Sequence, residues 1–278
     1  MLSQPTTFIV EALYTAFLFT KSDIKTTVIP ITSFAAAAAP LCGLARLPQS
    51  VFWIWLHLLQ FDVSNQTLSP EEDEVNKQDR PLPSKRITLR NAIFLRWVLI
   101  PACWALSAFY SREVLWASMS LVLFTVIYNE CSAHAGHWLV RNVVNAAGFA
   151  SFEAGATLIA GPNSHTLDTT AIIAICCSAG IFATTIHSQD FKDRDGDKAI
   201  GRHTIPIVAP AIARYTVVIP LLLWSAFLSN LWQLDVVASC GFLIVALFVG
   251  VRFLIFTTIA ADQVSFYWYN VSYESRVL

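Results

Sequence analysis

The stretch from Ile186 to Pro206 concentrates ionisable side chains in a chain that is otherwise mostly apolar. Its carboxylates and basic groups alternate within a few residues: Asp190, Asp193, Asp195 and Asp197, with Lys192, Arg194, Lys198 and Arg202. Asp190, Asp193 and Asp197 follow one another at helical spacing, so a helix would present them on one face. Carboxylates this close repel one another, and a hard divalent cation such as Mg²⁺, carrying a phosphate ligand, is their natural counter-charge. A solvated loop between two membrane helices is the alternative for this stretch taken alone.

A second polar stretch, residues 65–87, carries oxygen ligands and basic groups of the same kinds. Its candidate groups are Asn65, Glu72, Asp73, Asn76, Lys77 and Arg80. Several recur at steps close to helical turns, and Arg80 is a candidate for a bidentate grip on phosphate oxygens. Alone, the acidic run resembles a surface turn. Together, two acidic clusters at one mouth of an apolar bundle predict Mg²⁺ ions around a diphosphate whose hydrocarbon tail lies inside the bundle.

The composition indicates the kind of bundle that must position these groups. The 278 residues are 55% hydrophobic and 13% charged, whereas soluble domains carry about 25% charged residues. Apolar runs of about 20 residues recur, each long enough to cross the membrane as a helix. The expected fold class is therefore an all-α, polytopic transmembrane helical bundle forming a single domain over 1–278. The net charge of −1 says nothing about nucleic acid, and no basic tract suggests a nucleic-acid partner. Membrane lipid is the surrounding expected for such a bundle.

Eight spans are expected, with a ninth helix as an option. They cover residues 24–44, 48–64, 88–110, 113–130, 139–160, 168–188, 207–228 and 236–258. Residues 1–22 are predicted to form an amphipathic helix along the membrane interface, and 259–278 a tail or short ninth helix. The bundle is expected to surround a central cavity capped by the polar loops.

The loop charges predict the orientation of this bundle. Four spans separate the two polar stretches, so both leave the membrane on the same side. Of the 18 Lys and Arg residues, only Arg46 and Arg112 fall in the opposite loops. By the positive-inside rule the polar loops face the cytoplasm, and the endoplasmic reticulum is the expected membrane.

The polar stretches resemble the two signatures of the UbiA superfamily of intramembrane prenyltransferases. The family's second motif, Asp-x-x-x-Asp, is intact here as Asp193 and Asp197. Its first motif is altered, since Gln66 and Ser69 stand where the family has aspartates and Glu72-Asp73 compensates. This altered form, and the segment 137–145, resemble a fungal branch that includes membrane-bound terpene cyclases.

The resemblance implies a helical bundle with a lipid-facing cavity and a Mg²⁺-dependent ionisation of a C15 or C20 polyprenyl diphosphate. The implied metal ligands are Asn65, Glu72, Asp73, Asp190, Asp193 and Asp197, all of which except Glu72 are also expected to be catalytic. The implied diphosphate-binding residues are Lys77, Arg80, Arg141, Asn145, Lys192, Lys198 and Arg202. Metal ions and cationic side chains would neutralise the leaving diphosphate, and aromatic faces would surround the resulting cation.

Two outcomes share this chemistry. In a cyclase the cation is captured by its own double bonds, which the altered first motif favours; in a prenyltransferase an aromatic acceptor captures it. Glu153, in the middle of a span, is expected to face the cavity and to end the cation cascade or orient an acceptor, or else to be a neutral acid bonded to a neighbouring helix. An ion transporter or channel is the remote alternative, and it requires charged groups at mid-depth in several spans. The arginines within spans, Arg96, Arg214 and Arg252, are expected to reach lipid headgroups.

Overall fold

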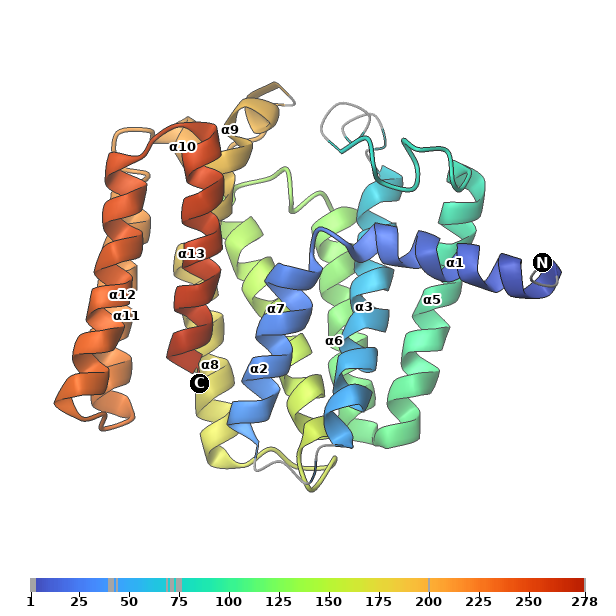
Figure 1. Ribbon diagram of the computed structural model, residues 1–278, viewed down its shortest axis with the longest axis horizontal. Coiled ribbons are helices and arrows are strands. Elements are labelled where there is room, and N and C mark those ends of the chain that lie inside the picture. Colours follow the sequence, from blue (N-terminus) through green and yellow to red (C-terminus); the bar gives the residue numbers. More distant parts are fainter. Residues whose placement is uncertain are drawn as a thin grey trace. The chain divides into compact units, whose positions relative to one another are not determined.

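The computed structural model describes residues 4–39, 43, 45–68, 70, 73, 77–199 and 201–277. Within these residues every regular element is a helix and none is a strand, which confirms the predicted all-α class (Figure 1). The chain divides into two compact units, one of residues 1–129 with 151–167 and one of residues 130–150 with 168–278. The expected single domain over 1–278 stays a prediction.

The first unit is built around one long helix. Its elements are α1 (Gln4–Thr20), the π-helix η1 (Ile24–Val28), α2 (Ile29–Ala38), α3 (Arg46–Leu68), α5 (Leu89–Tyr110), α6 (Arg112–Asn129) and the second half of α7 (Trp138–Ala160). Trp53 of α3 is fully buried and donates from Nε1 to Ser107 Oγ of α5 at 2.8 Å. Its ring lies against Gly155 of α7, where a Cβ atom would come within 2.3 Å of Cη2. The glycine therefore allows α3 and α7 to approach closely.

The second unit contains the first half of α7 and all elements after residue 167. These are α8 (Thr169–Thr185), the 3₁₀ turn η2 (Ile186–Gln189), α9 (Asp190–Ala199), α10 (Ile205–Val208), α11 (Tyr215–Leu231), α12 (Val236–Ile255) and α13 (Ile259–Val277). Asp168 and Asp235 cap the N-termini of α8 and α12, because each carboxylate accepts from a free backbone N–H of the first turn. Such caps explain why these helices begin where the loops end.

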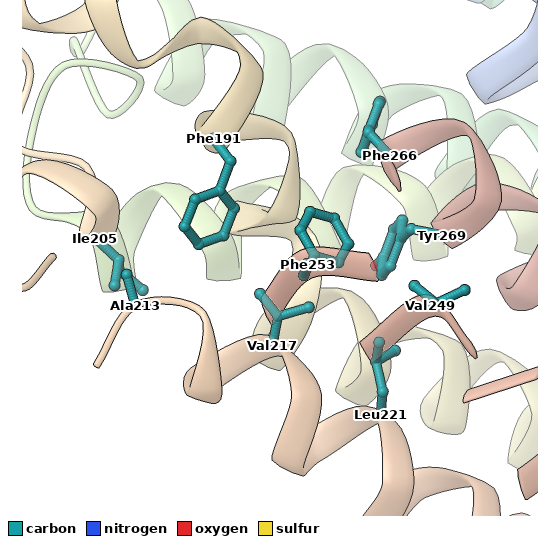
Figure 2. Close-up of a cluster of buried hydrophobic side chains, with 9 residues drawn as sticks. All are labelled: Phe191, Ile205, Ala213, Val217, Leu221, Val249, Phe253, Phe266 and Tyr269. Carbon is teal, nitrogen blue, oxygen red and sulfur yellow. The ribbon is translucent and has the colours of Figure 1, made fainter. Parts of the chain in front are cut away.

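A cluster of buried hydrophobic side chains holds α9 to the C-terminal helices (Figure 2). It consists of Phe191, Ile205, Ala213, Val217, Leu221, Val249, Phe253, Phe266 and Tyr269. The ring centroids of Phe191 and Phe253 are 5.6 Å apart, and the rings of Phe266 and Tyr269 stack at 5.9 Å. Burial of this apolar surface fixes the short, charged α9, which has little apolar surface of its own.

Among the described residues, four helical segments are long and apolar enough to cross a membrane: Leu89–Tyr110, Trp138–Ala160, Thr169–Lys198 and Val236–Ile255. Helices occupy each predicted span, but the count of eight or nine spans stays a prediction. The helix expected at 207–228 begins only at Tyr215, because Pro210 interrupts the pattern after α10. Residues 259–277 are a helix rather than a tail, and α1 lies within the predicted 1–22, whose position at the interface stays a prediction.

Candidate active site

The predicted aspartates of the second polar stretch lie on α9, as their spacing indicated. Asp190 and Asp193 stand in its first turn, where a carboxylate is stabilised by the helix dipole. Asp190 and Asp197 are 1% and 2% exposed, whereas about half of the Asp193 side chain is exposed. The helix therefore buries two of the three carboxylates and leaves the middle one accessible.

Each buried carboxylate is half satisfied. Asp190 Oδ1 accepts from Arg141 Nη1 at 2.6 Å, and Asp197 Oδ1 accepts from Arg202 Nη1 at 2.9 Å. The second oxygen, Oδ2, of both aspartates is buried without a hydrogen-bond partner. A buried acceptor left unpaired costs about 1–3 kcal/mol, more when charged, and a bound ion is one explanation for such an atom. Unpaired carboxylate oxygens suit a hard divalent cation.

Three of the predicted diphosphate-binding residues of this unit pair with carboxylates of α9. Arg141 lies in the first turn of α7, and Asn145 follows one helical turn later with a buried Nδ2 that has no hydrogen-bond partner. Lys192 pairs with Asp193 at 2.5 Å, and Lys198 is exposed. Arg141, Arg202 and Lys192 thus each pair with a carboxylate of α9.

His187, directly before α9, is buried and lies in a hydrogen-bond network. It is 2% exposed; its Nδ1 accepts from Asn142 Nδ2 at 3.3 Å, and its Nε2 lies 2.9 Å from Thr216 Oγ1. Because Thr216 donates to the Ala213 carbonyl, the network assigns the proton to Nε2. The neutral imidazole therefore links α7, η2 and α11 directly before α9.

In the first unit the structure brings Asp73 and Arg80 together. Arg80 Nη1 lies 2.8 and 2.9 Å from the two carboxylate oxygens of Asp73, and both residues are buried. Arg80 Nε is buried without a hydrogen-bond partner, so the guanidinium keeps a donor for a further acceptor. Exposed Asp79 pairs with Lys21 at 2.9 Å, and this hydrogen bond holds the pKa of Asp79 below its ordinary value. Lys77 is exposed.

The first motif places its amide residues on different sides of α3. Asn65 donates from Nδ2 to Asn129 Oδ1 of α6 at 3.1 Å. Gln66 instead donates to the Phe19 carbonyl at 3.0 Å, which ties α3 to the end of α1, and its own Oε1 is buried without a partner. The predicted ligand Glu72, and Asn76 beside it, lie outside the described residues.

Two buried acids were not among the residues predicted from the sequence. Asp62, one turn before Gln66 on α3, is 4% exposed, and its Oδ2 has no hydrogen-bond partner. The signal was present: a carboxylate inside an apolar span, at helical spacing from Asn65, is costly unless it is used. Asp262 of α13 is fully buried and paired with Arg214 at 2.8 Å. The expectation that Arg214 reaches headgroups is therefore wrong, because its charge is neutralised inside the protein.

Two further ionisable groups within predicted spans, Glu153 and Arg96, are buried. Glu153 is 1% exposed within the first unit, and its role stays a prediction. Arg96, expected to reach headgroups, is only 7% exposed and lies 3.4 Å from Thr67 Oγ1. No group of three His, Cys, Asp or Glu side chains converges as a ready metal centre within the described part of the chain. The unpaired oxygens of Asp190, Asp197 and Asp62 nevertheless provide the donor chemistry that Mg²⁺ prefers.

Comparison with known proteins connects this arrangement to a family. The chain is 34% identical over 266 residues to the fumagillin beta-trans-bergamotene synthase of Aspergillus fumigatus, a match that covers 94% of this chain and 89% of that protein. It is 31% identical over 228 residues to a diterpene cyclase of Hericium erinaceus, covering 78% and 72%. The expected similarity to fungal terpene cyclases is confirmed by these two relatives.

The fold is similar to solved structures as well. A UbiA homolog from Archaeoglobus fulgidus, solved bound to GPP and Mg²⁺, superposes with a TM-score of 0.71 at 13% identity, covering 94% of this chain and 98% of that one. The family model described as the UbiA prenyltransferase family matches residues 27–271, which include both polar stretches. The chain therefore belongs to the UbiA prenyltransferase family.

Proposed function

We propose that this protein is a Mg²⁺-dependent membrane enzyme that ionises a C15 or C20 prenyl diphosphate and cyclises the resulting cation. The observation that carries this proposal is the half-satisfied state of Asp190 and Asp197, each bound to an arginine through one oxygen and unpaired at the other. The names of the two fungal relatives, a bergamotene synthase and a diterpene cyclase, support cyclisation.

The residues divide into two roles. Those assigned to the metal are Asn65, Glu72, Asp73, Asp190, Asp193 and Asp197. Those assigned to the diphosphate are Lys77, Arg80, Arg141, Asn145, Lys192, Lys198 and Arg202. When bound, Mg²⁺ would neutralise the negative charge that develops on the leaving diphosphate.

The arginines of the second unit are suited to bind carboxylate and phosphate oxygens at the same time. Arg141 and Arg202 each donate to one carboxylate oxygen. A guanidinium carries five N–H donors in a planar fork, so it can keep its carboxylate and also bind phosphate oxygens. The unpaired Nδ2 of Asn145 supplies a further neutral donor. These groups would hold the diphosphate while the allylic C–O bond breaks.

The fate of the cation separates the proposal from its alternative. A cyclase must shield the cation from water and from external nucleophiles, whereas a prenyltransferase must admit an aromatic acceptor. The family description names prenyl transfer, and the buried Glu153 could orient an acceptor hydroxyl as well as receive a proton at the end of a cascade. We place the polar loops on the cytoplasmic side of the membrane, because lysine and arginine concentrate in those loops. The endoplasmic reticulum is the membrane we expect.

The deciding experiment uses purified protein in detergent, Mg²⁺ and C10, C15 or C20 diphosphate without acceptor, with products identified by mass spectrometry. The Asp197→Asn variant removes the buried negative charge of a proposed metal ligand. Asp195→Asn is the matched control, because it removes an exposed negative charge from the same helix at a residue that is not assigned to the metal. A cyclic hydrocarbon made by the wild type and by Asp195→Asn, but lost in Asp197→Asn, supports the cyclase.

The other outcomes are equally informative. An adduct formed only after addition of aromatic acids or quinols would replace the cyclase with a prenyltransferase. Equal product from Asp197→Asn and the wild type would contradict the assigned metal site. No turnover of any diphosphate in either arm would refute the enzymatic proposal.

A further inference from the structure

A buried ion pair lies outside the carboxylate cluster of the second unit. Asp262, in the first turn of α13, is fully buried, and both its oxygens accept from Arg214, from Nη1 at 2.8 Å and from Nη2 at 2.9 Å. Arg214 immediately precedes α11 and also donates from Nη1 to the carbonyl of Phe253 at 2.6 Å. The bidentate geometry orients the guanidinium plane as well as neutralising its charge.

The oriented guanidinium contacts the helix that carries the site. Its Cζ lies 4.6 Å from the centroid of the Phe191 ring, and Phe191 stands between Asp190 and Lys192 on α9. The ring is buried and packs against Phe253, as Figure 2 shows. One arginine therefore contacts α9, the end of α12 and the start of α13.

Two further contacts from α13 reach the same segment. The ammonium group of Lys192 lies 5.5 Å from the centroid of the Phe266 ring, and the hydroxyl of Tyr269 lies 2.8 Å from Thr185 Oγ1 at the end of α8. Helix α13 thus holds the chain both before and within α9.

The energetics of such a pair favour a role in orientation. A buried ion pair adds little net stability compared with well-packed apolar residues, because both charges lose their hydration. What apolar residues cannot provide is a fixed direction for a planar group that stacks on an aromatic ring.

We propose that Arg214 and Asp262 form a positioning pair that, through Phe191, sets how α9 presents Asp190, Asp193 and Asp197 to Mg²⁺. This inference rests on the proposed function. Neither residue of the pair contacts the reacting atoms.

The test replaces both partners at once, since loss of one alone leaves a buried charge and can unfold the protein. In the Arg214→Met, Asp262→Leu double variant the apolar residues keep the core filled, and the thermal unfolding midpoint without metal should stay close to that of the wild type. The half-saturating Mg²⁺ concentration for turnover should rise by about tenfold or more, the size of effect typical of residues that orient metal ligands. The rise in unfolding midpoint caused by Mg²⁺ with inorganic diphosphate should shrink in parallel.

A matched control destabilises the packing of α11 against α12 and leaves the Arg214–Asp262 pair unchanged. In Gly250→Ala a new Cβ on α12 would meet Val218 Cγ1 of α11 at 2.8 Å, which should lower the unfolding midpoint and leave the half-saturating Mg²⁺ concentration unchanged. A double variant with the Mg²⁺ response of the wild type would overturn the positioning role while the proposed function stands. The positioning role is also overturned if Gly250→Ala shifts the Mg²⁺ response as strongly as the double variant does. A wild type that shows neither Mg²⁺-dependent turnover nor Mg²⁺-dependent stabilisation overturns the proposed function and this inference with it.

Discussion

Arg141 and Asp190 form a buried ion pair in which Nη1 lies 2.6 Å from Oδ1, although 49 positions separate them in the chain. The pair joins the start of α7 to the start of α9. Its acid has one unpaired oxygen, so the arginine both orients the carboxylate and leaves room for a second cation. This relationship makes Arg141 the most informative basic residue to remove.

Arg141→Met should lower kcat/KM by about a hundredfold, because loss of one charged donor to a developing negative charge costs about 3 kcal/mol in the transition state. Steady-state kinetics with the preferred prenyl diphosphate measure this loss, and the unfolding midpoint of Arg141→Met establishes that the variant is folded, because Asp190 loses its buried partner. The matched control is Arg112→Met, since the side chain of Arg112 is 77% exposed in the first unit. Activity of Arg141→Met within threefold of that control would contradict the assignment of Arg141 to the diphosphate.

Removal of the metal should abolish turnover and lower stability together. Because Asp190 Oδ2 and Asp197 Oδ2 are buried and unpaired, Mg²⁺ with inorganic diphosphate should raise the thermal unfolding midpoint, as any ligand specific for the folded state does. The measurement is a thermal scan in detergent after chelation with EDTA, then after addition of Mg²⁺. The unfolding midpoint of Asp195→Asn should rise as much as that of the wild type. If Mg²⁺ and diphosphate leave the midpoint of the wild type unchanged, the assigned metal site is contradicted.

Asp62→Asn should raise the stability of the protein and lower its activity. The buried carboxylate makes no hydrogen bond through Oδ2, so neutralising it removes a desolvation cost and should raise the unfolding midpoint. If this oxygen serves the metal of the first cluster, turnover should fall by about tenfold at limiting Mg²⁺. Parallel thermal scans and Mg²⁺ titrations test both effects. Unchanged turnover in the more stable variant would assign Asp62 no part in the reaction.

Gly155→Ala should destabilise the first unit. The new methyl group would lie 2.3 Å from Cη2 of Trp53, whose ring is fully buried, and such overpacking costs about 1–3 kcal/mol. Gly148→Ala on the same helix is the control, since nothing lies within 4 Å of its Cβ position. It should be neutral or slightly stabilising because alanine restricts the unfolded chain. Equal unfolding midpoints for the two variants would show that α7 does not depend on close approach at Gly155.

Much of the candidate site was predictable because its signals are local. The spacing of Asp190, Asp193 and Asp197 predicted a helix with carboxylates on one face, and α9 is that helix. The spacing could not predict that Asp193 is exposed while its neighbours are buried. Burial depends on which elements cover the helix, and that information lies in residues far along the chain.

The sequence by itself determined the all-helical class, the positions of most helices and the identity of the ionisable groups, since these follow from hydrophobic periodicity, caps and motif spacing. Only the tertiary structure decided the partners: Arg141 with Asp190, Asn142 with His187, and Arg214 with Asp262. Each pair joins residues more than forty positions apart. The sequence alone does not distinguish a charged residue that reaches lipid headgroups from one that pairs with an opposite charge inside the protein. The pairing depends on packing, because packing brings the opposite charge within hydrogen-bonding distance.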